Sequence, residues 1–334
     1  MRHLQKSIAV TDRSSVGEAR REATTVAQTL GFGEQRRSDI SIVVTELANN
    51  ILRHANTGEL LLCPVETNAA TWLDIVALDT GPGIRDVSRA FEDGMSTIGT
   101  AGQGLGAVER LSDIVSLYSV PGKGTAVFCR FKLHEASETT PVGVVSIPIS
   151  GEIECGDSYL VLPGSGRSLY MMVDGLGHGV VAAEAAIEAV KAVRASAGES
   201  LAEIMTTTHN ALKATRGAAM SVALIDHERS VVKYAGVGNI SASLGNGITS
   251  RSMVSQNGTL GASVPRVQEF TYPFEPGMLL LMFSDGLNSK CGFGGYPGIS
   301  NRPHGLIAGL FYRDFSRRRD DATVLVASLG ESRT

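Results

Sequence analysis

A polar segment in the middle of the chain constrains the fold most, because it separates two stretches with regular hydrophobic patterns. His134 to Thr140 (HEASETT) has no hydrophobic period and is followed by Pro141, which is typical of a linker between compact parts. The chain has 334 residues, so each side of this segment has the length of an ordinary domain. We predict a two-domain α/β (α+β) protein with domains at 1–133 and 142–334 and a linker at 134–141.

Both halves combine helical and strand patterns. In the first half, apolar residues at helical spacing predict helices over 14–30 and 38–54, and Ser15 with Glu18 fits a capping box at the first of them. Runs rich in β-branched, leucine and aromatic residues predict strands in both halves. The strands are expected at 59–64, 71–79, 114–119, 125–132, 142–149, 158–162, 168–173, 220–226, 231–236, 278–283 and 322–328, and further helices at 180–197 and 201–216.

Composition excludes several classes of protein. The formal net charge of −4 gives no indication of a basic surface for nucleic acid, and a hydrophobic fraction of 43% allows a sizeable core. No apolar run follows the charged N-terminus, and the longest such run, 278–283, is too short to cross a bilayer. We therefore expect a soluble, cytoplasmic protein with no membrane or nucleic-acid partner. Its cysteines, which lack zinc-site spacing, are expected to be reduced and buried: Cys63, Cys129, Cys155 and Cys291.

A carboxylate and an amide lie on one face of the second predicted helix. Glu46 and Asn50, in the segment ELANN, are four residues apart, which places them side by side on a helix. Together they could hold a hydrated Mg²⁺ and polarise an attacking hydroxyl group.

Glycine-rich segments follow in the same half. DTGPGI, residues 79–84, comes directly after a predicted strand, so Asp79 could accept a hydrogen bond from an exocyclic amine. GQGLG, residues 102–106, opens a predicted helix at 107–111, and glycines before a helix N-terminus can surround a phosphate group. GKGT, residues 122–125, adds a tight turn and a hydroxyl group. In this order the segments predict a nucleotide site.

Over residues 8–132 the chain resembles the GHKL ATPases, with ELANN, DTGPGI and GQGLG similar to the N, G1 and G2 boxes. Within that family it resembles the anti-sigma and stressosome serine kinases of the RsbT and RsbW type. The resemblance implies a GHKL α/β sandwich that binds ATP with Mg²⁺, in which Glu46 activates a substrate serine and Asn50 binds the Mg²⁺. It also implies a serine on a small STAS-domain protein as the phosphate acceptor. The nucleotide-binding residues would be Asn50, Asp79, Gly81, Gly83, Gly102, Gly104, Gly106 and Thr125.

The second half carries four acidic motifs, each beside a predicted strand: ECGD at 154–157, DGLGHG at 174–179, SDG at 284–286 and DDAT at 320–323. Oxygen ligands without a histidine or cysteine cluster favour Mg²⁺ or Mn²⁺ over zinc. Two such ions close together can lower the pKa of a bridging water and produce a hydroxide nucleophile. The pattern therefore predicts metal-dependent hydrolysis.

Residues 142–329 resemble the PPM-type phosphatases, in the branch of SpoIIE and RsbX, through GDSYLV, MMVDGLGHGVVAAEAA, YAGVGNI, FEPGMLLLMFSDGL and DDATVLVASL. The resemblance implies an αββα sandwich with two Mn²⁺ or Mg²⁺ ions, and a phosphoserine on a STAS-domain protein as substrate. Asp157, Asp174 and Asp285 would be the catalytic metal ligands, together with the Gly175 carbonyl oxygen. We expect Asp320 to be the last ligand in preference to Asp321.

Two further features admit more than one interpretation. Some relatives outside this branch have a histidine two residues after the aspartate equivalent to Asp174, where this chain has Leu176. We favour a structural role for His178, with acid catalysis as the alternative. The basic run 317–319 is either a solvated turn or a contact for an acidic phosphoprotein.

The two halves together predict a bifunctional switch, which phosphorylates and dephosphorylates serine on STAS-domain partners of a sigma-factor regulatory network. The alternative is a phosphoserine phosphatase whose first domain only binds ATP or a partner. The sequence leaves open the identity of the partner, the choice between Mn²⁺ and Mg²⁺ and the oligomeric state.

Overall fold

The structure is a computed structural model that describes residues 4–87, 104–134, 142–263 and 266–330. The chain divides into two compact units, Met1–Glu66 with Ala70–Thr139 and Thr67–Ala69 with Thr140–Thr334, which we name the N-terminal and C-terminal units. Of the expected linker 134–141, only His134 is among the described residues. The mixed α/β, two-domain fold class predicted from the sequence is confirmed.

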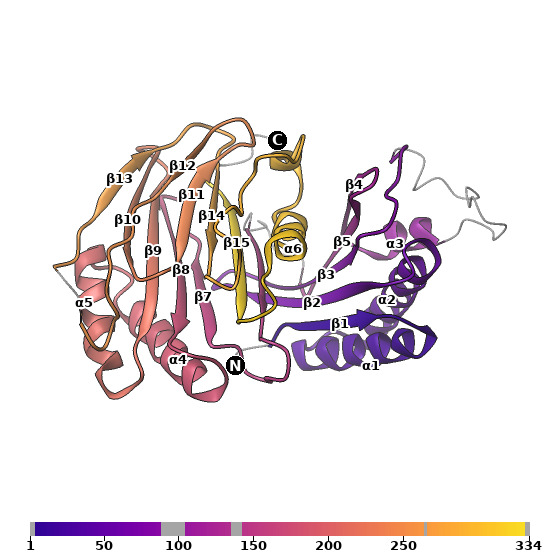
Figure 1. Cartoon of the computed structure of the whole chain (residues 1–334), viewed down its shortest axis with the longest axis horizontal. Coiled ribbons are helices and arrows are strands. Elements are labelled where there is room, and N and C mark those ends of the chain that lie inside the picture. Colours follow the sequence, from indigo (N-terminus) through magenta and orange to yellow (C-terminus); the bar gives the residue numbers. More distant parts are fainter. Residues whose placement is uncertain (1–3, 88–103, 135–141, 264–265, 331–334) are drawn as a thin grey trace. The chain divides into compact units, whose positions relative to one another are not determined.

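The N-terminal unit is one sheet with helices packed on one face (Figure 1). Its five strands pair in the order β1-β2-β3-β5-β4, and all the neighbours are antiparallel. Buried apolar residues of the helices, such as Ala23, Val44 and Leu47, form one core with strand residues such as Ile75. The elements are β1 (Lys6–Val10), α1 (Arg13–Leu30), α2 (Glu34–His54), β2 (Gly58–Glu66), β3 (Thr71–Asp79), α3 (Gly104–Leu111), β4 (Ile114–Val120) and β5 (Gly124–Lys132).

The predicted capping box at the first helix is wrong. α1 is capped by Asp12, whose side chain accepts hydrogen bonds from the backbone N–H groups of Ser14 and Ser15, and the Ser15 side chain returns the contact. Asp12 therefore takes the first position of the box, and Ser15 takes the position that was assigned to Glu18. α2 likewise begins at Glu34, earlier than the expected start at residue 38.

The C-terminal unit contains two five-stranded sheets, ordered β13-β10-β9-β8-β7 and β12-β11-β14-β15-β6. Figure 1 shows them face to face, with α4 and α5 outside the first sheet and α6 outside the second. The layers therefore follow the expected αββα order. The elements are β6 (Val142–Ile147), β7 (Asp157–Leu162), β8 (Arg167–Gly175), α4 (Val180–Ala195), α5 (Leu201–Ala211), β9 (Ala218–Asp226), β10 (Val231–Val237), β11 (Ser241–Gly245), β12 (Ser250–Ser252), β13 (Phe270–Pro273), β14 (Leu279–Phe283), α6 (His304–Phe315) and β15 (Ala322–Ser328).

Several elements were not predicted, and α6 shows why. Its residues from Gly305 to Tyr312 are all buried, so it lacks the one-sided apolar stripe by which an amphipathic helix is recognised. The short strands β1, β11, β12 and β13 were missed as well. The helix expected to reach residue 216 ends at Ala211 and continues as a single 3-10 turn, Leu212–Ala214.

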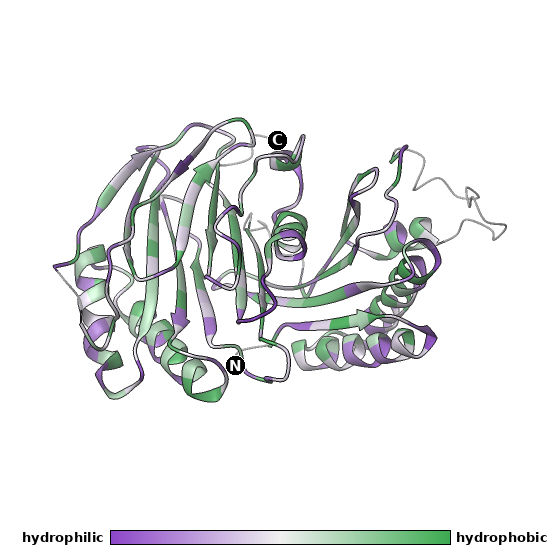
Figure 2. Cartoon of the chain, viewed as in Figure 1, coloured by the Kyte–Doolittle hydropathy of each residue, from purple (hydrophilic) through white to green (hydrophobic). Residues whose placement is uncertain are grey.

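Hydrophobic residues follow the strands and the inner helix faces, while α1 carries hydrophilic residues on its outer side (Figure 2). All four cysteines are buried and unbridged, as expected: Cys63, Cys129, Cys155 and Cys291. Among the described residues, no helix combines the length and the apolar character needed to cross a membrane.

Candidate active sites

The N terminus of α3 lies against the two polar residues that α2 presents on one face. A β-carbon placed on Gly104 would lie 3.1 Å from Glu46 Oε2 and 3.6 Å from Asn50 Oδ1. A side chain at this position would be in tight contact with the carboxylate, which would have to shift slightly to make room. The structure thus brings together the first and third segments of the predicted nucleotide site.

Asp79 organises the second segment at the end of β3. Its Oδ1 accepts a hydrogen bond from the Gly81 N–H at 2.8 Å and another from the Thr125 N–H at 3.1 Å. The Thr125 hydroxyl lies 2.9 Å from that of Ser119, whose oxygen accepts a hydrogen bond from the Ile84 N–H. These bonds fix Asp79, the DTGPGI turn and the start of β5 as one structure.

The remaining glycines of this site have different settings. Gly83 has a positive φ of 72° and its backbone packs against the Val120 carbonyl group, whereas Gly106 is buried inside α3. Gly102 lies outside the described residues.

The acidic motifs of the C-terminal unit converge at one end of its sheets. Asp157, the first residue of β7, is the cross-strand partner of Asp174 near the end of β8. From the second sheet, the Ser284 hydroxyl donates to Asp157 Oδ2 at 2.6 Å and accepts from the Thr323 N–H. Asp285 follows Ser284 and is drawn into the same group of carboxylates.

The carboxylates raise one another's pKa. Burial raises the pKa of Asp157 to about 7, and the charges of Asp321 and Asp285 add to the rise, while the hydrogen bond from Ser284 opposes it. Burial raises the pKa of Asp174 to about 8, helped by the charges of Asp157, Asp285 and Asp320. Like charges held together in a partly buried site favour the protonated form unless a cation is added.

An amide lies between two of these carboxylates. Asn239 Nδ2 donates to Asp285 Oδ2 at 2.7 Å and reaches Asp174 Oδ2 at 3.4 Å. In the side-chain arrangement shown, no group of three or more His, Cys, Asp or Glu residues within the described ranges could hold a metal ion.

The two aspartates of the DDAT motif have different environments. Asp321 is buried, and its carboxylate accepts hydrogen bonds from the backbone N–H groups of Ile149 and Gly156, each at 2.7 Å. Asp320 is exposed and close enough to raise the pKa of Asp174. Asp321 therefore ties two backbone segments together and also acts on Asp157 through its charge, whereas the exposed Asp320 acts on Asp174 through its charge. Gly286 sits on this backbone without room for a side chain, because a β-carbon there would collide with the Asp321 carbonyl oxygen.

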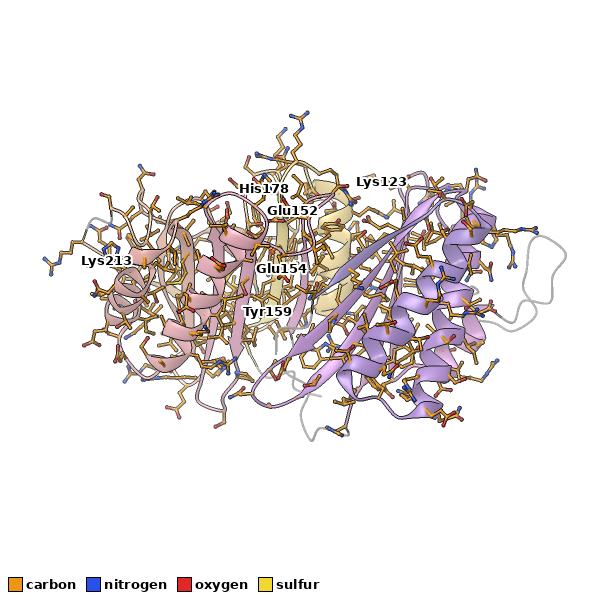
Figure 3. All side chains as sticks on the ribbon, turned by 90° about the horizontal axis from the view of Figure 1, so that it is seen from below. Lys123, Glu152, Glu154, Tyr159, His178 and Lys213 are labelled. Atoms are coloured by element: carbon orange, nitrogen blue, oxygen red, sulfur yellow. The ribbon has the colours of Figure 1, made fainter. Side chains whose placement is uncertain are left out.

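The structure shows the surroundings of His178 and of the basic run 317–319, whose roles the sequence left open. His178 is exposed, and its Nδ1 lies 2.8 Å from Glu152 Oε1, so the two side chains form a pair (Figure 3). In the basic run, Arg318 is held by Tyr312, with its guanidinium 4.5 Å from the ring centroid and a hydrogen bond to the hydroxyl group. At least one side chain of this run is therefore committed to packing within the unit.

Sequence reasoning assigned no role to Asn239 or Ser284. Both stood in segments that had been singled out, YAGVGNI and SDG. Their contacts to Asp174, Asp285 and Asp157 join segments far apart in the sequence, so only their position just after a strand could have indicated them.

Comparisons with known proteins find similar domains in both halves of the chain. Residues 9–131 match the family described as histidine kinase-like ATPase domain, and residues 164–292 match stage II sporulation protein E (SpoIIE). The serine/threonine-protein kinase RsbT of Bacillus subtilis is 38% identical over 123 residues, 37% of this chain and 92% of RsbT. The phosphoserine phosphatase RsbX of the same organism is 27% identical over 156 residues, 46% of this chain and 78% of RsbX.

A solved chain from work on the bacterial stressosome, as a modular system adapted to control secondary messenger signalling, is also similar. It has a TM-score of 0.52 and 28% identity, over 57% of this chain and 100% of that chain. The protein therefore belongs to the histidine kinase-like ATPase family through an N-terminal domain homologous to RsbT, fused to a SpoIIE-type PPM phosphatase domain homologous to RsbX.

Proposed function

We propose that the protein is a bifunctional switch, which phosphorylates serine on a STAS-domain partner with its N-terminal unit and removes that phosphate with its C-terminal unit. The observation that carries the proposal is the convergence of Asp157, Asp174 and Asp285, whose charges act on one another at one end of the sheets. Repulsion between these carboxylates destabilises the fold in the absence of a cation. A hydrolytic metal site requires such a group of carboxylates, because they bind the metal ions.

The donor set of the C-terminal site fits hard divalent cations. All its donors are oxygen atoms. Burial first, and then the neighbouring carboxylates, raise the pKa of Asp157 and Asp174, and a bound cation would favour their charged forms. Asp157, Asp174, Asp285 and Asp320 would hold two Mn²⁺ or Mg²⁺ ions, together with the Gly175 carbonyl oxygen. Ions bound there supply a water of lowered pKa as nucleophile.

The residues of the C-terminal unit have separate tasks in this hydrolysis. Ser284 fixes one oxygen of Asp157 by its hydrogen bond, and Asp321 fixes the segments on either side through the backbone of Ile149 and Gly156. A bond forms between water oxygen and phosphorus while the bond from phosphorus to the serine oxygen breaks. The products are serine and orthophosphate.

The N-terminal unit has the parts required for the opposite reaction. Glu46 is placed beside the N terminus of α3, where it can take the proton of an incoming serine hydroxyl as the γ-phosphoryl group leaves ADP. Asn50, one turn further along α2, would hold the Mg²⁺ of ATP, and Asp79 would contact the adenine amine. The phosphorylated serine formed here is the substrate class of the other unit.

The partner class is proposed from the relatives. RsbT is a serine/threonine kinase and RsbX a phosphoserine phosphatase, and this chain joins homologues of both. We propose that STAS-domain phosphoproteins of a cytoplasmic sigma-factor network are the shared substrates.

Hydrolysis is tested with the full chain and a phosphoserine-bearing STAS protein in Mn²⁺ or Mg²⁺. We expect release of orthophosphate that EDTA stops and that added Mn²⁺ restores. Calorimetry should show ATP binding that Asp79→Ala weakens. If phosphate release persists at full rate in EDTA, the proposed metal mechanism is wrong.

A further inference from the structure

One arginine of the C-terminal unit lies beside the loop that follows Asp174. Arg216 is exposed, and its Nη1 lies 3.0 Å from the position that a β-carbon on Gly177 would occupy. Because Gly177 has no side chain and a positive φ of 93°, the guanidinium group can extend over the backbone of this loop.

The backbone before β9 holds Arg216 at this end of the sheet. Gly217 donates its N–H to Thr215 Oγ1 at 3.0 Å, and its carbonyl oxygen accepts from the Leu176 N–H at 3.0 Å. In the ladder between β8 and β9, Gly175 is paired with Ala218. Arg216 therefore lies just before the first residue of β9, across the β8–β9 ladder from the residues that follow Asp174.

Among the residues that the structure describes, the guanidinium group of Arg216 is not held by a carboxylate. Within the described ranges, no carboxylate lies within ion-pair distance of Arg216. This setting differs from that of Arg130, which forms a bidentate pair with a buried aspartate.

From this placement we infer that Arg216 binds the phosphoryl oxygens of the substrate from its position at the loop that follows Asp174. The inference rests on the proposed phosphatase function. A phosphoserine dianion is repelled by a group of carboxylates, so a cation at the rim favours its approach. A guanidinium group matches two phosphate oxygens at once and keeps its charge at every physiological pH. Arg216 takes no part in bond cleavage.

The test compares Arg216→Gln and Arg216→Lys with Lys213→Gln in the full chain. Lys213 is exposed and carries the same charge three residues earlier, and Figure 3 shows it at the outer edge of the unit, away from His178 and Glu152. It therefore controls for a general loss of positive charge. Because both replaced side chains are exposed, the thermal unfolding of the three variants should be unchanged, which checks that they fold.

Each variant is assayed with p-nitrophenyl phosphate in Mn²⁺, and orthophosphate is titrated as a competitive product inhibitor. We expect Arg216→Gln to raise KM and the inhibition constant of orthophosphate together by about tenfold to a hundredfold, the loss of hydrogen bonds to a charged group. Arg216→Lys should recover part of this loss, and Lys213→Gln should stay within about twofold of wild type. The Mn²⁺ affinity from calorimetry should be unchanged in all of them.

Unchanged orthophosphate inhibition in Arg216→Gln would overturn the inference while leaving the phosphatase proposal intact. A loss seen only with a phosphoprotein substrate would place Arg216 against the partner's protein surface and would also overturn it. If the wild-type chain hydrolyses no substrate, the proposed function fails. Arg216 is then judged from calorimetric binding of orthophosphate in Mn²⁺, which must be present in wild type and lost in Arg216→Gln.

Discussion

A buried aspartate of the N-terminal unit and a half-buried aspartate of the C-terminal unit have opposite kinds of neighbour. Asp74 on β3 faces Arg130 across the strand pair, and the guanidinium group contacts both carboxylate oxygens, at 2.6 Å and 2.7 Å. Burial raises the pKa of Asp74, and Arg130 opposes the rise. Burial also raises the pKa of Asp174, but there the neighbouring charges are carboxylates, which add to the rise.

This difference in neighbours distinguishes Asp74, whose charge has a structural role, from Asp174, whose charge we propose to be functional. Arg130 is further enclosed by Trp72 and Phe128, with its guanidinium carbon 4.5 Å and 5.6 Å from their ring centroids, so the pair near Asp74 is complete within the fold. We propose that the site around Asp174 is completed by a bound cation. Replacing Asp74 should therefore mainly lower stability, whereas replacing Asp174 should mainly lower phosphatase activity.

The largest expected effect is on hydrolysis. Asp174→Ala should lower phosphatase activity by several orders of magnitude, since a lost ligand removes the activated water. The rate of p-nitrophenyl phosphate hydrolysis in Mn²⁺ measures this. Asp74→Ala, assayed below its own unfolding temperature, is the matched control and should keep the hydrolysis rate of the C-terminal unit. A near-normal rate in Asp174→Ala would remove this residue from the site.

For stability we expect the opposite order, with the larger loss on replacing Asp74. Asp74→Ala should lower the unfolding free energy of the N-terminal unit by about 3–5 kcal/mol, because Arg130 is left buried without a partner. Denaturant unfolding checks this, and the double variant Asp74→Leu with Arg130→Met should recover most of the loss. Asp174→Asn in metal-free protein should instead stabilise the C-terminal unit, because a repelling charge is removed. If Asp174→Asn destabilises the metal-free unit, the carboxylates there are not in conflict.

Asp320 and Asp321 allow the same comparison, between a functional and a structural aspartate, within one motif. Asp321→Ala should cost about 2–4 kcal/mol of stability, because two backbone N–H groups lose a charged acceptor. Asp320→Ala should leave the unfolding temperature nearly unchanged while lowering Mn²⁺ affinity in calorimetry. The opposite pattern, with metal affinity lost only in Asp321→Ala, would exchange their roles.

The last prediction concerns the pH dependence of stability. The folded-state pKa values of Asp157 and Asp174 lie above the ordinary value of 3.8, at about 7 and about 8, so the folded state binds more protons than the unfolded state. Stability of the metal-free C-terminal unit should therefore fall as pH rises from about 5 to about 8. Saturating Mn²⁺ should abolish this slope, and Asp174→Asn should reduce it. A metal-free unit that becomes more stable over this range would contradict the shifts.

The sequence predicted what depends on local spacing, and missed what depends on packing between elements. Glu46 and Asn50 could be placed together because they are one helical turn apart. The acidic motifs could be placed at strand ends because each adjoins an apolar run. The bridging position of Asn239 and the bond from Ser284 to Asp157 required the cross-strand pairing and the contact between sheets, which no local pattern contains. The helix α6 was missed for the same reason, since its burial on all sides is a property of the assembled unit.

The most direct measurement of the bifunctional switch follows phosphate on a STAS-domain partner. With the phosphatase silenced by Asp285→Ala, labelled ATP and Mg²⁺ should lead to phosphoserine that accumulates on the partner. Adding Glu46→Ala to that chain should abolish the label while calorimetry still shows ATP binding, because Glu46 is proposed to act on the serine hydroxyl and not on the nucleotide. If the Asp285→Ala chain binds the partner but leaves it unlabelled, the N-terminal unit is a binding module and the kinase half of the proposal is wrong.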